Sequence, residues 1–207
     1  MKKMFLASSF VDVADLFVEF VGEKCAGKTV TFIPTASLVE EVRFYVETGK
    51  EALEGRGMIV DELEISTASR QEIESKIQKN DYIYITGGNT FFLLQELKRT
   101  GADKIIKEQV DFGKIYIGES AGAVIMSRNI EYVKDMDDSA SAPDIGSFSS
   151  LGMIDFYPVP HHTNFPFKES VESIITNYNG ELDLCPISNA QVIVVNGGEF
   201  EVWTAET

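Results

Sequence analysis

In residues 115–126, a serine with small neighbours lies between a strand-like apolar run and an apolar helical pattern. A β-branched and aromatic run ends at Gly118, Ser120 follows, and an apolar helical pattern begins at Ala121 and Gly122. Strand, tight turn and helix with the pattern G-x-S-x-G form a nucleophile elbow, which holds a serine hydroxyl clear of the backbone. The positive end of the helix would face the same point, where a developing oxyanion could be stabilised. The alternative is an ordinary turn with Ser120 as an N-cap, which does not explain the small neighbours.

A serine nucleophile needs a base, and the only two histidines in the chain are His161 and His162. They follow a predicted strand, as do Ser120 and the pair Gly87 and Gly88. In open α/β sheets, ligands bind beyond the carboxyl ends of the strands, so these segments should converge if the strands are parallel. Successive side chains on a strand point to opposite faces, so only one histidine can meet the serine. The other is expected to lie on the surface.

The glycine pair is better suited to an oxyanion hole than to a phosphate loop. The chain has neither G-x-x-x-x-G-K-[ST] nor G-x-G-x-x-G at this place. A glycine lets a backbone N–H approach a substrate oxygen closely. We therefore expect the N–H groups of Gly88 and Ala121 to form the hole. A strand-to-helix turn capped by Asn89 or Thr90 is compatible with the same role.

Strand and helix patterns alternate along most of the chain, which predicts an α/β fold with a mostly parallel sheet. Strands are predicted at residues 3–8, 29–34, 58–65, 82–85, before the elbow, at 154–159, and in a terminal hairpin at 192–195 and 200–203. Helices are predicted at residues 11–22, 40–55, 69–79, 91–98, 102–112 and 168–177. Residues 131–153 lack periodicity and are expected to form a long surface loop of the kind that is often functional. Without repeats or linkers, residues 1–207 are predicted to form one domain.

The composition is that of an ordinary soluble protein, with 44% hydrophobic and 25% charged residues. A net charge of −15 argues against binding to nucleic acid or to an anionic membrane. The apolar part of the first nine residues is too short for a signal peptide, and no run is long enough to span a membrane. Cys25 and Cys185 follow no pairing pattern, which indicates a reducing compartment, and we infer the cytoplasm.

Three segments resemble the peptidase E (aspartyl dipeptidase) family of serine peptidases, which is related to the cyanophycinases. They are Y-I-T-G-G-N-T-F at 84–91, G-E-S-A-G-A at 118–123 and P-H-H-T-N at 160–164. The segments occur in the family's order with similar spacing, and the likeness runs through most of the chain. The resemblance implies a three-layer α/β/α sandwich like that of class I glutamine amidotransferases. It also implies Ser120 as nucleophile, His161 as base, and peptide hydrolysis without a cofactor or metal.

One departure from the family concerns the acid of the triad. The family usually carries a glutamate just before the final hairpin, and the matching position here is Ile187. An apolar residue cannot hold an imidazole tautomer or stabilise imidazolium. The loop at residues 133–138 offers three aspartates between the serine and the histidines, and we rank Asp135 first and Asp137 second as the residue that orients the base.

Two alternatives to an aspartate remain open. Asp135, Asp137 and Asp138 could all be solvated loop charges. Asn189 or a backbone carbonyl could instead fix the tautomer without adding charge, and turnover would then be slow.

A second departure concerns specificity. Aspartyl dipeptidases carry arginines shortly after the histidine, in a G-E-T-R-like segment, to bind the substrate's aspartate side chain. This chain has no arginine after Arg128, and Lys168 is the only lysine or arginine after the two histidines. Bidentate recognition of a carboxylate is therefore not available there. We expect no strict preference for N-terminal aspartate unless Arg43, Arg70 or Arg99 reaches the pocket from elsewhere in the fold.

The first prediction is thus a cytoplasmic serine peptidase that acts on small peptides, with no nucleic-acid or membrane partner. A catalytically silent binding protein that kept the fold but lost the acid is the second. An α/β-hydrolase esterase is the least favoured, because that fold needs a histidine after the acid, late in the chain, and none follows His162. The natural substrate and the oligomeric state stay open.

Overall fold

A seven-stranded sheet runs through the computed structural model, which describes residues 1–22 and 24–206. Its spatial order is β3 (Ile59–Glu62), β2 (Thr29–Ile33), β4 (Tyr82–Ile85), β5 (Ile115–Glu119), β1 (Lys3–Ala7), β8 (Gln191–Asn196) and β9 (Glu199–Thr204). The first five of these strands are parallel, whereas β8 and β9 form an antiparallel hairpin beside β1. The predicted parallel sheet and terminal hairpin are both confirmed.

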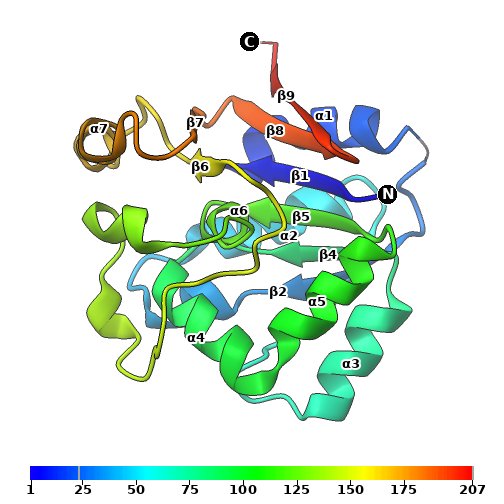
Figure 1. The fold of residues 1–207 in the computed structure, drawn as a ribbon. Coiled ribbons are helices and arrows are strands. Elements are labelled where there is room, and N and C mark those ends of the chain that lie inside the picture. The colour runs from blue at the N-terminus through cyan, green and yellow to red at the C-terminus, as the bar shows by residue number, and fades with distance from the viewer. Residues whose placement is uncertain (23, 207) are drawn as a thin grey trace.

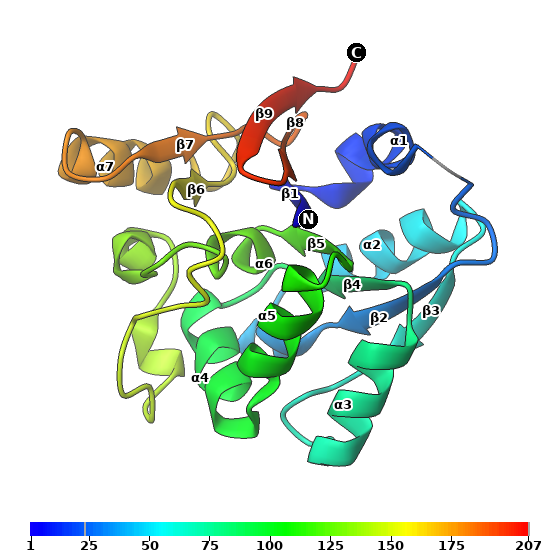
Figure 2. The ribbon, with the colours of Figure 1, turned by 45° about the vertical axis from the view of Figure 1, so that its right-hand side comes forward.

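Helices cover both faces of this sheet (Figures 1 and 2). One face carries α1 (Phe10–Val21) and α2 (Phe44–Glu54), and the other carries α3 (Arg70–Lys79), α4 (Thr90–Thr100) and α5 (Ala102–Asp111). The arrangement is the three-layer sandwich that the family resemblance implies.

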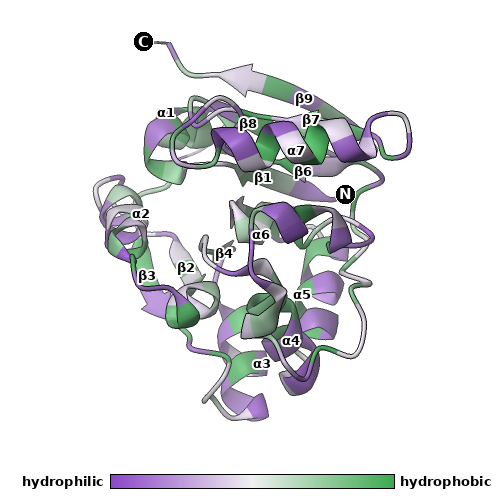
Figure 3. Ribbon diagram, turned by 90° about the vertical axis from the view of Figure 1, so that its left-hand side faces the viewer, coloured by the Kyte–Doolittle hydropathy of each residue, from purple (hydrophilic) through white to green (hydrophobic). Residues whose placement is uncertain are grey.

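The alternation of side chains along the strands builds a separate core on each face. In β1, Met4 and Leu6 pack with the core of α3 to α5, whereas Phe5 and Ala7 pack with the core of α1 and α2. Central strands are buried on both sides and therefore read as continuous apolar runs. Figure 3 shows hydrophobic and hydrophilic segments alternating along the outer helices, as expected for helices with one buried face.

A second, two-stranded sheet extends the carboxyl edge of the first. Strand β6 (Tyr157–Val159) pairs in parallel with β7 (Leu184–Pro186), and α7 (Lys168–Tyr178) connects them. The predicted strand at 154–159 is therefore shorter than expected and belongs to this small sheet. The strand β7 was not predicted, because three half-buried residues carry too short a pattern.

The start of one helix and the predicted loop at 131–153 also differ from the prediction. The 3₁₀ segment η1 (Thr35–Val39) follows β2, and α2 begins only at Phe44. The predicted loop at 131–153 contains two further 3₁₀ segments, η2 (Glu131–Asp135) and η3 (Ser139–Ser141). Among the described residues, no helix has both the length and the apolar character that crossing a membrane requires.

Candidate active site

Ser120 stands in a sharp turn between β5 and α6 (Ala121–Val124), with φ of 47° and ψ of −106°. A positive φ is unusual for a residue with a side chain and is often found at functional sites. A Cβ atom at Gly118 would lie 2.4 Å from the carbonyl oxygen of Gly122, and one at Gly122 would lie 2.4 Å from that of Ile85. Neither position can hold a side chain, as the elbow requires. Helix α6 is a single turn, shorter than the predicted helix, so its dipole contributes less than the sequence suggested.

The structure brings His161 to Ser120. The Nε2 atom of His161 lies 2.9 Å from the Oγ atom of Ser120, and its Nδ1 atom lies 2.8 Å from Oδ1 of Asn189. The imidazole stacks on the ring of Phe167, with centroids 4.6 Å apart. A hydroxyl on one ring nitrogen and an oxygen acceptor on the other are the two contacts of a general base.

The neighbouring histidine takes no part in this arrangement. The Nε2 atom of His162 lies 3.7 Å from the Oε1 atom of Glu172 on helix α7. The two rings are separated by a turn rather than by strand alternation, because β6 ends at Val159 and His161 has φ of 64°. The geometry thus agrees with the expectation that only His161 meets Ser120. The reason is the turn at His161, and not the alternation of side chains along a strand.

Asn189, and not Asp135, occupies the third position. The exposed carboxylate of Asp135 accepts a hydrogen bond from Nδ2 of Asn177 at 3.0 Å, and the predicted contact of Asp135 with His161 is wrong. Ile187 has its side chain fully buried in the core. Asn189 follows two residues later, where its backbone N–H donates to Oδ1 of Asn164 at 2.9 Å. The sequence analysis left Asn189 open as an alternative to an aspartate, and the contact with Nδ1 of His161 agrees with that alternative. The sequence ranked it below Asp135 because the short strand β7, which places it beside the base, was missed.

The second-ranked aspartate lies near the glycine loop rather than near the base. The Oδ2 atom of Asp137 accepts the backbone N–H of Thr90 at 2.9 Å, in the first turn of α4. Asp138 caps η3 by accepting the N–H of Ala140 at 2.9 Å. Neither carboxylate is the partner of Nδ1.

The glycine loop after β4 packs directly against the serine. A Cβ atom at Gly87 would lie 3.3 Å from Cβ of Ser120. Gly88 has φ of 128°, and a Cβ there would lie 2.3 Å from the carbonyl carbon of Ala36. Within the described part of the chain, no hydrogen bond engages the N–H of Gly88 or Ala121. Neither donor is thus committed to another recorded acceptor, which is compatible with the predicted oxyanion hole.

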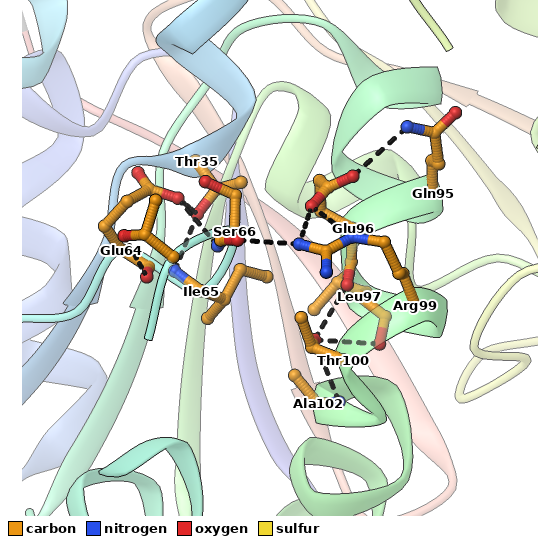
Figure 4. A network of polar contacts seen from close by, with 11 residues as sticks. Thr35, Glu64, Ile65, Ser66, Gln95, Glu96, Leu97, Arg99, Thr100 and Ala102 are labelled. Carbon is orange, nitrogen blue, oxygen red and sulfur yellow. Dashed lines mark hydrogen bonds and ion pairs between the residues drawn. The ribbon is translucent and has the colours of Figure 1, made fainter. Parts of the chain in front are cut away.

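A polar network joins the segment that contacts this loop to its surroundings (Figure 4). The hydroxyl of Thr35 donates to Glu64 at 2.7 Å, and the Arg99 guanidinium donates to the carbonyl of Ser66 at 2.7 Å. These bonds connect the turn after β2 with the segment after β3 and with α4. The turn after β2 contacts the glycine loop directly, because the carbonyl of Ala36, next to Thr35, accepts the N–H of Asn89 at 2.8 Å.

Burial sets the charge state of the base. Desolvation lowers the pKa of His161, and the hydrogen bond to Asn189 opposes this only in part. The imidazole is therefore neutral at neutral pH, as a general base must be.

The flank of the site beside the glycine loop is acidic. Desolvation, together with repulsion from Glu40, raises the pKa of Asp137 to about 6. The buried hydroxyl of Tyr45 lies among the charges of Glu40, Glu119, Arg43 and Asp137, and desolvation and the carboxylates raise its pKa. Arg43 is the arginine that approaches this flank.

The other two arginines left open by the sequence are engaged elsewhere. Arg99 forms an ion pair with Glu96, and Arg70 lies near Gly101 between helices.

A strained elbow serine, a buried neutral histidine and two open backbone donors at the carboxyl edge of a parallel sheet define a serine hydrolase of the α/β class. Among the described residues, no three His, Cys, Asp or Glu side chains gather as they would around a metal ion.

Comparison with known proteins places the chain within this class. The model of peptidase family S51 matches residues 4–203, and the chain belongs to that family of serine peptidases. It is 57% identical over 199 residues to uncharacterized peptidase Lmo0363 of Listeria monocytogenes, covering 96% of this chain and 97% of the relative. It is 32% identical over 155 residues to peptidase E of Haemophilus influenzae, covering 75% and 64% of the two chains.

Solved structures agree with the fold. The crystal structure of a candidate peptidase E from Listeria monocytogenes superposes with a TM-score of 0.95 and 54% identity over 100% of both chains. A peptidase from an acI-B1 Actinobacterium shares the fold, with a TM-score of 0.71 and 20% identity over 99% of this chain and 88% of the other.

Proposed function

We propose that this protein is a cytoplasmic, dipeptidase-like enzyme that hydrolyses small peptides through Ser120, His161 and Asn189. The observation that carries the proposal is the pair of contacts on one imidazole, 2.9 Å to the serine hydroxyl and 2.8 Å to the amide oxygen. The assignment to small peptides rests on the family, and the assignment to the cytoplasm rests on cysteine usage.

In the proposed reaction, the Oγ atom of Ser120 attacks the carbonyl carbon of the peptide bond while Nε2 of His161 accepts the hydroxyl proton. The N–H groups of Gly88 and Ala121 bind the resulting oxyanion. The histidine then gives its proton to the leaving amine, and an acyl-enzyme remains. Water, activated by the same histidine, hydrolyses this ester and restores the free serine.

Asn189 supports the base without supplying a charge. Its Oδ1 atom accepts the Nδ1 proton, which leaves the lone pair of Nε2 directed at the serine. The amide thus fixes the productive tautomer. In a serine peptidase, replacing the acid by an amide that leaves the histidine in the wrong tautomer lowers kcat by about 10⁴. Here the tautomer is kept and only the stabilisation of imidazolium is missing, so we expect a smaller deficit.

The acidic flank bears on the substrate. Glu40 and Asp137 lie beside the glycine loop, whereas Arg43 is the arginine near this flank. Such a charge distribution favours a substrate with a positive or neutral group there over one with an extra carboxylate. We therefore propose that N-terminal aspartate is not selected.

Active-site labelling tests the proposal directly. A fluorophosphonate should modify the native protein on Ser120, and Ser120→Ala should abolish both labelling and dipeptide hydrolysis while the thermal unfolding temperature stays unchanged. His161→Ala should lose labelling, whereas the matched variant His162→Ala should retain it, because His162 contacts Glu172 instead. A native protein that is neither labelled nor active on a broad dipeptide panel would leave the silent binding protein as the better account.

A further inference from the structure

The turn that follows β1 contacts each segment that carries a member of the proposed triad. The carbonyl of Ala7 accepts the backbone N–H of Ser120 at 2.8 Å. The hydroxyl of the next residue, Ser8, accepts the backbone N–H of His161 at 3.0 Å and donates to the carbonyl of Ile187 at 3.0 Å. Ile187 lies two residues before Asn189 on the same segment. One hydroxyl therefore joins the loop of the base to the loop of its partner.

The position of Ser8 makes this contact a fixed one. Its side chain is 1% exposed, so water does not compete for the hydroxyl. The single hydroxyl proton is committed to Ile187, which leaves the oxygen lone pairs for the N–H of His161. The hydroxyl thus uses its one donor and one of its two lone pairs, and a buried hydroxyl left without these bonds would be strongly unfavourable.

The backbone of His161 needs such a restraint. Its φ of 64° lies in the left-handed region, which a residue with a side chain adopts only when its surroundings determine it. On the other side, the carbonyl of His161 accepts the N–H of Asn164 at 2.9 Å. The bond from Ser8 fixes the N–H side of the same residue, so the peptide units before and after the imidazole are both held.

We propose that Ser8 is a positioning residue that sets the alignment of His161 between Ser120 and Asn189, and this proposal rests on the proposed hydrolase function. Ser8 does not touch the substrate. It acts by fixing the N–H side of the base's backbone, and it adds a side-chain link to the backbone bonds that already join this loop to the segment that carries Asn189. A general base that moves by about 1 Å can lose about a hundredfold in rate.

The test is Ser8→Ala, with Ser9→Ala as the matched control. Ser9 precedes helix α1, and its side chain makes no capping hydrogen bond. We expect Ser8→Ala to lower kcat for dipeptide hydrolysis about tenfold or more, to change KM less than about twofold, and to slow fluorophosphonate labelling in parallel. Ser9→Ala should behave as the native protein, and Ser8→Thr, which keeps a hydroxyl, should recover part of the loss.

A second readout does not depend on activity. With only two histidines, the imidazole proton resonances can be followed by NMR and assigned with His162→Gln. Burial lowers the pKa of His161, and the hydrogen bond to Asn189 works against this shift. Loosening the turn exposes the ring, so the pKa of His161 in Ser8→Ala should rise towards its ordinary value, and the acidic limb of the pH profile of kcat/KM should move to higher pH.

These measurements separate the possible failures. A native protein that is not labelled refutes the proposed function, and the NMR titration then still decides whether Ser8 positions His161. If Ser8→Ala does not fold, Ser8→Cys preserves the side-chain shape and should show the same loss of kcat. A folded Ser8→Ala with lower thermal stability but native kcat, labelling rate and histidine titration would show that Ser8 is merely structural and would overturn the proposal.

Discussion

Replacing Asn189 by aspartate would put a carboxylate on the base with little change in side-chain size. The amide oxygen of Asn189 lies 2.8 Å from Nδ1 of His161, whose pKa is lowered by burial. Two unit charges about 4 Å apart attract by about 4 kcal/mol at an effective dielectric constant of 20. Residue 189 is half-buried, and part of this attraction is lost to desolvation. We expect about 1.4 to 2.8 kcal/mol to remain, which raises the pKa of His161 by about one to two units.

The assay is the pH dependence of kcat/KM, together with an NMR titration of His161. In Asn189→Asp, the acidic limb should move upward by the same one to two units, because the base is active only when neutral. On the alkaline plateau, kcat should rise, because the carboxylate stabilises the imidazolium that forms during attack. Asn189→Ala is the control and should lower kcat without raising the pKa. A titration of His161 in Asn189→Asp that matches the native one would refute the contact and the reasoning built on it.

Three further expectations follow from the site. Gly88→Ala should lower the free energy of unfolding by more than about 2 kcal/mol in urea, because its Cβ would meet the backbone of Ala36, whereas Gly146→Ala, with open space around its Cβ, should not. Asp137 has its pKa raised from 3.8 to about 6 by folding, so the native state holds the proton more tightly and stability falls as pH rises through this window. Asp137→Asn should therefore be more stable than the native protein at pH 8 by about 1 to 2 kcal/mol, with the difference vanishing below pH 4. In a panel of dipeptides, those with N-terminal aspartate should be cleaved no better than those with neutral first residues, and a hundredfold preference, about 2.7 kcal/mol, would contradict this.

The parallel sheet and the elbow were predictable because their constraints are local. The apolar run at residues 115–117 has the pattern of a buried strand. The turn around Ser120 needs small residues, because Gly118 and Gly122 lie too close to neighbouring backbone for a side chain. The periodicity of apolar residues and the spacing of the glycines were therefore enough to predict the strand and the elbow. Convergence of the serine, glycine and histidine segments followed from topology alone, since parallel strands end at one edge.

The identity of the group on Nδ1 was not predictable in the same way. It depends on β7, whose three residues show no clear pattern, and on the pairing of Val159 with Pro186 that aligns two distant loops. Asp135 had the right chemistry and the wrong location, because η2 directs it towards Asn177. The turn of His161 at positive φ is likewise set by tertiary contacts and not by its own sequence.

The neutral partner changes the pH range of the site as well as its rate. A carboxylate on Nδ1 would hold a protonated imidazole and so would remove the base as pH falls. In this protein burial lowers the pKa of His161, and only the amide of Asn189 works against it. The base therefore stays neutral to lower pH than it would beside an acid. A Ser-His-Asn site of this kind gives up transition-state stabilisation and in return keeps a competent base under mildly acidic conditions, so below about pH 6 the native protein should outperform Asn189→Asp even though the variant is faster at alkaline pH.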